Sequence, residues 1–337
     1  MEDLPSLLCM SAAQLKSFGL REDKARVVSG QLNEEFILER LGLYRKESAQ
    51  IITIYDADYP PILKQVSQPP WILYALGRME LLGEPSIGIV GTRTPTAYGK
   101  KMAESLSFEL SQAGMAVVSG LARGIDTEAH LGALKGKAGT IAVLGCPVDQ
   151  VYPPENLSLY RDIAAQGVLI SEYPIGTKVH PGLFFPLRNR IIAGLSLGVL
   201  VVEAAERSGS LITADQAMEE SRDVYAVPGP ATSPKSRGTL QLIKQGAKMV
   251  TEAGDILEEY GYALPSQEVE SSRQIHTILT NEEQLVYDLI HSEILTFDSL
   301  LETTRFDFGH LHAVLLSLIL KKQGKITAWF RIYIDLT

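Results

Sequence analysis

Six short apolar runs, separated by segments of helical character, constrain the fold of this chain more than any other feature. The runs are 86–90, 115–118, 140–144, 167–170, 198–202 and 223–227, with a seventh at 248–250 expected at a sheet edge. Strands so continuously rich in Val, Ile and Leu are typically buried on both faces. Helices are expected between them at 98–113, 127–135, 157–166 and 213–221. The pattern predicts an α/β fold: a Rossmann-like, mostly parallel sheet flanked by helices.

The segment before this sheet differs in character. Residues 1–75 are helical in pattern, with glycine breakers at Gly19 and Gly42 and a short strand expected at 51–55. We therefore expect a small N-terminal helical domain over 1–75 and the sheet domain over 76–262.

The segment after the sheet divides again. Residues 263–275 are polar and without periodicity, which predicts a linker. Residues 276–337 form a last domain, in which three helices are expected at 281–291, 297–302 and 308–322 and a hairpin at 325–334. That order of elements is typical of a winged helix. A chain of 337 residues has room for about two to three domains.

Composition excludes several classes of protein. No apolar run reaches the roughly 18–20 residues of a membrane span, so no membrane association is expected. The acidic N-terminus, Met1 to Asp3, lacks the features of a signal peptide. Cys9 and Cys146 lack CxxC spacing, so neither a disulfide framework nor a zinc site is expected, and a reducing cytoplasm is the simplest location. The net charge of −9 disfavours a general basic coat but permits one local basic groove.

Glycine-rich turns with polar side chains follow several of the predicted strands. They contain Gly91, Thr92 and Arg93 after the first run, Ser119, Gly120, Arg123 and Gly124 after the second, and Ser208, Gly209, Ser210 and Thr213 after the fifth. Glycine lets backbone N–H groups approach an anion, and a following helix N-terminus favours negative charge. Because parallel strands end at one edge of the sheet, these turns predict a ligand with several phosphates.

Each turn also has a purely structural interpretation. A glycine turn after a strand is often only a tight connection. Asp126 is more simply the N-cap of its helix than a catalytic carboxylate, and Arg123 can pair with Asp126 or with a carbonyl. His130 has no partner motif, which favours a packed or solvated histidine.

Residues 171–196 combine cations with aromatic side chains. Lys178, His180, Arg188 and Arg190 accompany Phe184 and Phe185. Cations beside exposed aromatic rings suit a single nucleic-acid strand, whose phosphates pair with charge while its bases stack. The alternative is that the phenylalanines belong to the core and only the cations are exposed.

No catalytic set accompanies these features. The chain lacks a Walker A sequence, a GxSxG elbow and a metal-spaced set of His, Asp and Glu, so no catalytic residues, metal or cofactor are expected. Glu203 and Glu206 can be read as paired carboxylates or as groups that orient arginines. A binding protein is therefore expected rather than an enzyme.

Several motifs, in this order, resemble the DNA-processing protein A family (DprA, also called Smf). They are 91–93 (GTR), 119–126 (SGLARGID), 152–156 (YPPEN), 171–174 (SEYP), 185–190 (FPLRNR), 208–214 (SGSLITA), 227–229 (VPG) and 246–247 (GA). The resemblance implies a Rossmann-like core that binds single-stranded DNA and forms a homodimer. It implies the RecA recombinase as a partner, loaded onto incoming DNA during natural transformation. It also implies a SAM-like N-terminal domain and a C-terminal winged helix.

Residue by residue, the resemblance makes Arg93 a phosphate-binding arginine. It assigns Arg188, Asn189 and Arg190 to the DNA-binding element, with Phe185 as its aromatic. The chain departs from the family pattern at Thr92, where serine is common.

A second departure is Gly182, where many members have a DNA-contacting lysine, so that Lys178 or His180 has to supply that charge. The expected third helix of the winged helix, 308–322, is apolar with few basic residues. It favours protein contact over DNA reading.

Two rival functions remain open at this point. One is a nucleotide-using enzyme on a related fold, such as a nucleoside monophosphate phosphoribohydrolase, although residues 226–230 lack the GTxxE continuation of that family's loop. The other is a winged helix that reads duplex DNA while the central domain acts as a sensor.

Overall fold

The structure is a computed structural model that describes residues 10–262, 280–292 and 297–320. These residues fall into two compact units that divide at residue 266. The predicted linker at 263–275 and the predicted hairpin at 325–334 lie outside the described residues.

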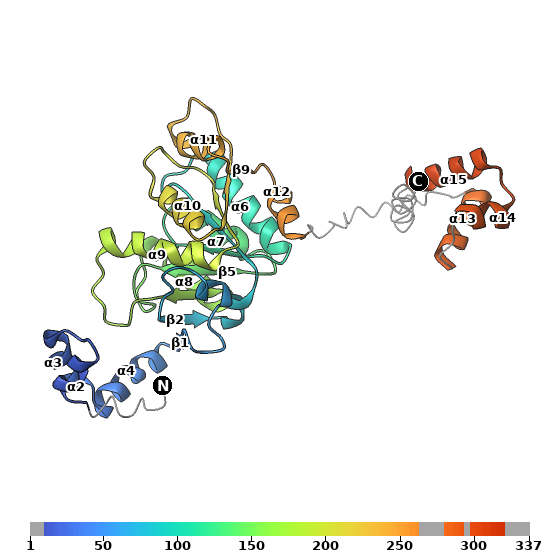
Figure 1. The fold of residues 1–337 in the computed structure, drawn as a ribbon. Helices are drawn as coiled ribbons and strands as arrows, with labels where there is room; N and C mark the ends of the chain where they lie inside the picture. The colour runs from blue at the N-terminus through green and yellow to red at the C-terminus, as the bar shows by residue number, and fades with distance from the viewer. Residues whose placement is uncertain (1–9, 263–279, 293–296, 321–337) are drawn as a thin grey trace. The chain divides into compact units, whose positions relative to one another are not determined.

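One nine-stranded sheet organises the first unit, in the order β1-β2-β6-β5-β4-β3-β7-β8-β9 (Figure 1). Its strands are β1 Gln50–Thr53, β2 Ile72–Gly77, β3 Ser86–Val90, β4 Ala116–Ser119, β5 Thr140–Leu144, β6 Val168–Ser171, β7 Gly198–Val201, β8 Asp223–Ala226 and β9 Lys248–Met249. Seven neighbouring strands, β6-β5-β4-β3-β7-β8-β9, are parallel. Strands β1 and β2 are antiparallel additions at the β6 edge. The predicted Rossmann-like fold class is confirmed, and every strand predicted before residue 263 is present, with its ends shifted by at most two residues.

Helices cover both faces of this sheet. They are α5 Pro61–Lys64, α6 Ala97–Gln112, α7 Ile125–Ala133, α8 Leu157–Gln166, α9 Pro181–Leu195, α10 Gly209–Glu219, α11 Arg237–Lys244 and α12 Gly254–Leu257. One core cluster joins the sheet to α5, α9, α10 and α11, and two further clusters join its other face to α6, α7, α8 and α12. The core therefore forms two apolar layers with the sheet between them.

Strand β2 and the helices α5, α9, α11 and α12 were not predicted. Helix α9 lies in the stretch that we interpreted only as an unusual set of cations and aromatics, because Pro186 and Gly182 weakened its helical pattern. Strand β2 directly follows Pro69, Pro70 and Trp71, and before residue 75 we expected a strand only at 51–55.

The boundary expected at residue 75 is wrong, because it cuts through β2. Strands β1 and β2 precede that boundary and belong to the sheet. The helices before them are α2 Ala12–Ser17, α3 Glu22–Gln31 and α4 Glu34–Lys46. Helix α4 packs on the sheet unit, since the ring of Tyr44 stacks on Tyr74 at 5.0 Å and its hydroxyl accepts a hydrogen bond from the Ile175 N–H at 3.1 Å.

The second unit contains three described helices, α13 Asn281–Ser292, α14 Phe297–Thr304 and α15 Phe308–Leu320. Val286, Leu300, Leu311 and Leu315 are fully buried and form its core. Across the described residues, no helix combines the length and the apolar character needed to span a membrane.

The order of the strands reverses beside β3. The chain proceeds from β3 to β4 on one side and later returns to β7 on the other side. Since α6 follows β3 on one face of the sheet and α10 follows β7 on the other, the connections diverge here. Open α/β sheets bind their ligands at such a switch point.

Candidate nucleic-acid interface

A cavity of about 460 Å³ lies at this switch point, beyond the carboxyl ends of β3, β4 and β7 and beside α9. The predicted site residues that line it are Gly91, Thr92, Arg93, Phe185, Arg188, Asn189, Ser208, Gly209, Ser210 and Thr213. Ser119, Gly120, Arg123, Gly124, Lys178, His180 and Arg190 are not among its lining residues. We call this space the switch-point cavity.

The turn after β3 is closely packed and presents one exposed cation. The Thr92 N–H donates to the Glu203 carbonyl at 2.7 Å, and a Cβ on Gly91 would lie 2.6 Å from Ile125. Gly124 has a φ of +82°, and a Cβ there would collide with the Thr92 carbonyl. Arg93 is exposed, and none of the ion pairs between described residues involves it. Its guanidinium is therefore free to bind a phosphate.

The turn after β4 is held by a carboxylate. Asp126 is buried, and its carboxylate accepts hydrogen bonds from the N–H groups of Gly120 at 3.1 Å and Ala122 at 3.4 Å. The N-cap of α7 is Gly124, which offers no side-chain cap, so the N-cap interpretation of Asp126 is wrong. Burial raises the pKa of Asp126, while Arg188 opposes that rise.

Arg188 is buried and has a structural role, so its guanidinium is not exposed for contact with DNA. Only 4% of it is exposed, and its Nη1 donates to the carbonyls of Gly120 at 2.7 Å and of Val143. A Cβ on Gly120 would collide with the guanidinium. Burial lowers the pKa of Arg188 to about 10, and Asp126 counteracts part of that shift. The side chain ties α9 to the ends of β4 and β5.

Phe185 does not provide the exposed aromatic ring that we expected. It is 9% exposed and packs against Gly145, where a Cβ would lie 2.5 Å from its ring. Tyr152 covers it at a centroid separation of 4.9 Å and is itself 38% exposed. Tyr152 lines a small recess together with Arg93 and Arg123. The accessible aromatic beside the cations is therefore Tyr152, which the sequence indicated only as part of the 152–156 motif.

The other predicted cations have different surroundings. Arg190 pairs with Glu172 at 2.5 Å, and Arg123 pairs with Glu155 instead of with Asp126 or a carbonyl. Lys178 and His180 are exposed in the loop before α9, where His180 meets the half-buried Phe184 edge-on at 5.8 Å.

The N-terminus of α10 supplies the third wall of the switch-point cavity. The Ser208 and Ser210 hydroxyls lie 2.7 Å apart, and Ser208 caps the helix by accepting from the Ser210 N–H at 3.4 Å. Gly209 has open space around it, whereas Thr213 is buried. Hydroxyl donors and the positive end of a helix dipole thus face the same space as Arg93.

Two titratable groups near the site have structural roles. Glu203 is 4% exposed, and its two oxygens accept hydrogen bonds from the N–H of Thr96 at 2.9 Å and its hydroxyl at 2.5 Å, at the start of α6. His130 is fully buried; it accepts from the Leu121 N–H at 3.2 Å and lies 2.7 Å from the Thr140 hydroxyl. Burial lowers the pKa of His130 to about 3, so the ring is neutral.

Comparisons with known proteins agree with this architecture. The model of the family described as DNA recombination-mediator protein A matches residues 50–261. DNA processing protein DprA of Bacillus subtilis is 46% identical over 231 residues, which are 68% of this chain and 76% of that protein. Protein Smf of Synechocystis sp. is 42% identical over 264 residues, or 77% of this chain, and the match spans 65% of that relative's length.

Two solved structures share the fold. DNA processing protein A of Streptococcus pneumoniae has a TM-score of 0.61 at 37% identity, over 76% of this chain and 94% of that one. DNA processing protein A of Helicobacter pylori, whose structure describes a single-stranded DNA binding mode, has a TM-score of 0.57 at 31% identity, over 64% of this chain and 98% of that one. With the family model matched over the whole sheet, this chain belongs to the DNA recombination-mediator protein A family.

Proposed function

We propose that this chain binds single-stranded DNA through the switch-point cavity and acts as a recombination mediator without catalysing a reaction. One observation carries the proposal: Arg93 is exposed and unpaired in the described part of the chain, where two glycine turns and the N-terminus of α10 converge. The DNA-binding mode described for the Helicobacter pylori relative supports it.

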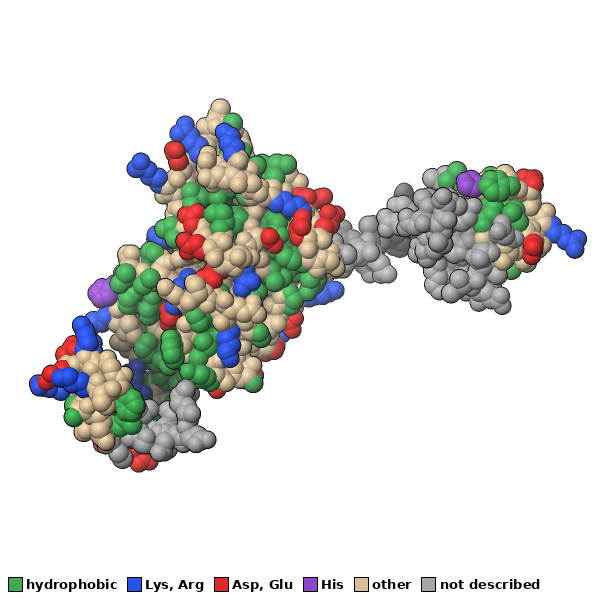
Figure 2. Space-filling view, in the orientation of Figure 1, with side chains coloured by type: hydrophobic (Ala, Val, Ile, Leu, Met, Phe, Trp, Pro, Cys, Tyr) green, Lys and Arg blue, Asp and Glu red, His purple; other side chains and the backbone are tan. Residues whose placement is uncertain are grey.

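Positive charge that is concentrated locally explains how a chain with a net charge of −9 can bind DNA. Figure 2 shows Lys and Arg side chains projecting from the end of the unit that carries α11, while acidic side chains gather near α12. Phosphates respond to the cations within about one Debye length, roughly 8–10 Å in physiological salt. A basic cavity on an acidic protein therefore binds a strand locally and repels nucleic acid elsewhere.

A single strand suits the site better than a duplex. Tyr152 offers a ring on which an unpaired base stacks, and Arg93 lies beside it for the adjoining phosphate. In a duplex the bases are already stacked on one another and do not reach such a ring.

The finer parts of the proposal rest on membership of the family. They are a homodimer formed through the Rossmann-like domain, the loading of RecA recombinase onto the bound strand during natural transformation, and a cytoplasmic location. RecA loading is measured as the rate of filament formation on a strand already covered by single-strand-binding protein, with and without this chain. An unchanged rate would contradict the loading role and leave the DNA-binding role untouched.

The first prediction concerns Arg93. We expect Arg93→Gln to weaken binding of a single-stranded oligonucleotide about 10- to 100-fold, because a hydrogen bond to a charged group contributes about 1.5–3 kcal/mol. The slope of log affinity against log salt should fall by about 0.7, the value for one phosphate contact on a single strand. Fluorescence anisotropy titrations at several salt concentrations measure both quantities.

Lys16→Gln is the matched control for Arg93→Gln, since Lys16 is an exposed cation on α2 and lines none of the cavities described here. Equal losses in the two variants would contradict the assignment of the cavity. Incubation of the same samples with nucleoside monophosphates tests the rival enzymatic function. Hydrolysis that is abolished by Glu203→Gln would replace this proposal with an enzyme.

A further inference from the structure

A second cavity of about 460 Å³ adjoins the first one at Arg93. It lies between the turn before α6, the turn before α7 and the 3-10 helix Pro154–Asn156, and we call it the neighbouring cavity. Its charged lining consists of four cations and two carboxylates: Arg93, Lys100, Arg123, Lys235, Glu128 and Glu155. Because Arg93 borders both cavities, a polymer that contacts Arg93 in the first cavity can continue into the second.

The cations of the neighbouring cavity differ in how far they are neutralised. Lys235 donates to the Thr94 carbonyl, so its position is fixed while its charge meets no carboxylate in any ion pair between described residues. Arg123 pairs with Glu155, and Lys100 pairs loosely with Glu128 at 3.6 Å. Arg93 and Lys235 together leave two positive charges uncompensated.

The Arg123–Glu155 pair is suited to exchange. About half of each side chain is exposed, and ion pairs this open to solvent contribute little to stability. A phosphate that reaches Arg123 restores the same charge-assisted hydrogen bonds, so the cost of breaking the pair is small. The backbone beside Glu155 is anchored at Asn156, whose side-chain amide donates to the Leu121 carbonyl at 2.9 Å.

We propose that the neighbouring cavity binds the next backbone phosphate of the strand held at Arg93, and that Glu155 occupies Arg123 until this phosphate displaces it. The proposal rests on the proposed single-stranded-DNA function and extends it to a second subsite with a built-in competitor. A polynucleotide backbone fits better than a free anion, because the two cavities share Arg93 and a strand alone presents linked phosphates to both.

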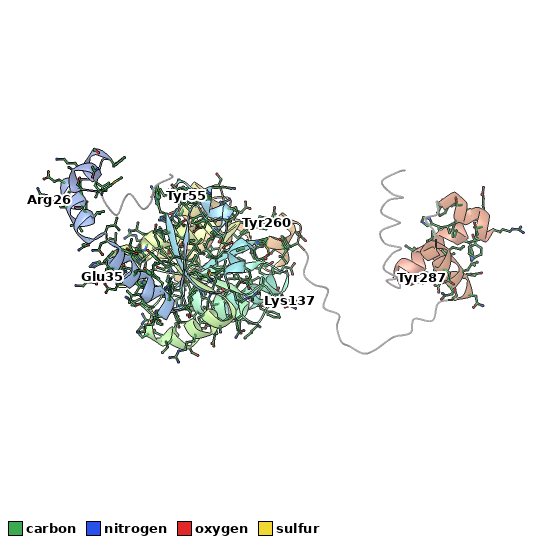
Figure 3. The ribbon with its side chains drawn as sticks, turned by 90° about the horizontal axis from the view of Figure 1, so that it is seen from below. Arg26, Glu35, Tyr55, Lys137, Tyr260 and Tyr287 are labelled. Carbon is green, nitrogen blue, oxygen red and sulfur yellow. The ribbon has the colours of Figure 1, made fainter. Side chains whose placement is uncertain are left out.

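The first test compares Lys235→Gln with Lys137→Gln across a series of oligothymidylates of increasing length. Lys137 is exposed, lines neither cavity and points away from the unit in Figure 3. On strands long enough to cover both cavities, we expect Lys235→Gln to lose about three- to tenfold in affinity and about 0.7 in salt slope. On the shortest strand that still responds to Arg93→Gln, the loss should vanish.

The length series also separates a direct role of Lys235 from an indirect one. Lys235 holds the Thr94 carbonyl, next to Arg93. If it acted only by positioning Arg93, its loss would weaken short and long strands equally, which would overturn the second subsite. Thermal unfolding of each variant shows whether the unit remains folded.

The second test removes the competitor. Glu155→Gln should raise the affinity for long strands about two- to fivefold with little change in the salt slope, because the phosphate contacts Arg123 in both proteins but in the variant no longer has to displace a carboxylate. Glu104→Gln is the matched control: Glu104 pairs with Lys135 as Glu155 pairs with Arg123, but lines neither cavity. An equal gain in both variants would reduce the effect to net charge and overturn the proposal.

The outcomes also separate this proposal from the one it rests on. If Arg93→Gln weakens binding while the Lys235 and Glu155 variants behave like their controls, the neighbouring cavity is not a second phosphate site. The proposed function would still stand. If Arg93→Gln itself has no effect, the proposed function fails. Calorimetry with inorganic phosphate completes the test. If phosphate binding depends on Lys235 while Lys235→Gln leaves the binding of long strands unchanged, the neighbouring cavity is a site for a free anion. That result would overturn the proposal.

Discussion

At the scale of single residues, accessibility decides which side chains of the family-like motifs can meet a ligand. Arg93 and Arg188 both come from motifs that suggested DNA contact, yet one is exposed and the other is 4% exposed. The partners of Arg188 are the carbonyls of Gly120 and Val143, which are 68 and 45 positions away along the chain. Local patterns carry no information on such distant partners, so the sequence predicted the arginine but not its burial.

Tyr152, and not Phe185, is the exposed aromatic ring at the site. The sequence did not predict this either, because local patterns do not show which ring is buried. A strand stacked on Tyr152 gains about 1–3 kcal/mol per base. We expect Tyr152→Leu, which still covers Phe185, to weaken binding of single-stranded DNA at least fivefold with an unchanged salt slope, because no phosphate contact is lost. Tyr152→Phe should bind like the natural chain.

Tyr55→Leu is the matched control for Tyr152→Leu, since Tyr55 is 64% exposed, lies in the turn after β1 and lines neither cavity (Figure 3). Anisotropy titrations measure the affinities. A Tyr152→Leu variant that binds as tightly as Tyr55→Leu would contradict the stacking of a base on Tyr152.

At the scale of elements, the parallel strands were predictable because each is a continuous apolar run. Helix α9 was not predicted, because Pro186 and Gly182 oppose helix formation, and tertiary packing of Ile191 and Ile192 in the core outweighs that preference. Strand β2 was missed because its pairing partners, β1 and β6, are set by the sheet and not by its own sequence. The site could be located at the sheet edge, but its exact membership depended on how α9 is oriented.

His130 joins elements that the site depends on, and its pKa makes that connection sensitive to acid. The folded chain keeps the ring neutral with a pKa of about 3, whereas an unfolded histidine has a pKa of about 6.5. As pH falls below about 6.5 the unfolded state takes up a proton that the folded state refuses, so the free energy of unfolding decreases.

Urea unfolding at pH 7.5 and pH 5.5 tests this behaviour. The natural chain should lose about 1.4 kcal/mol more than His130→Gln between these two values, because the variant lacks the titrating group. The variant should be less stable at pH 7.5, where the natural ring makes both of its hydrogen bonds. Equal losses in the two proteins would show that His130 is protonated in the folded state.

At the scale of the whole molecule, the charges that we propose to bind DNA belong to one unit. Every cation that lines the two cavities lies between Arg93 and Lys235, within the first compact unit. In the second unit, α15 contains no Lys or Arg and exposes Phe308 and Leu316. A helix without Lys or Arg carries no permanent positive charge to pair with phosphates, whereas its exposed apolar side chains suit contact with a protein.

We therefore expect a chain that ends at residue 266 to bind single-stranded DNA within about twofold of the full chain, with the same salt slope, because no phosphate contact is removed. Far-UV circular dichroism and thermal unfolding establish that the shortened chain is folded, and anisotropy titrations compare the two proteins with single-stranded and duplex oligonucleotides. A loss of more than about fivefold, together with a smaller salt slope, would place phosphate contacts in the second unit. A full chain that prefers duplex, and a shortened chain that does not, would favour a duplex-reading winged helix over the protein-contact role that the apolar α15 indicates.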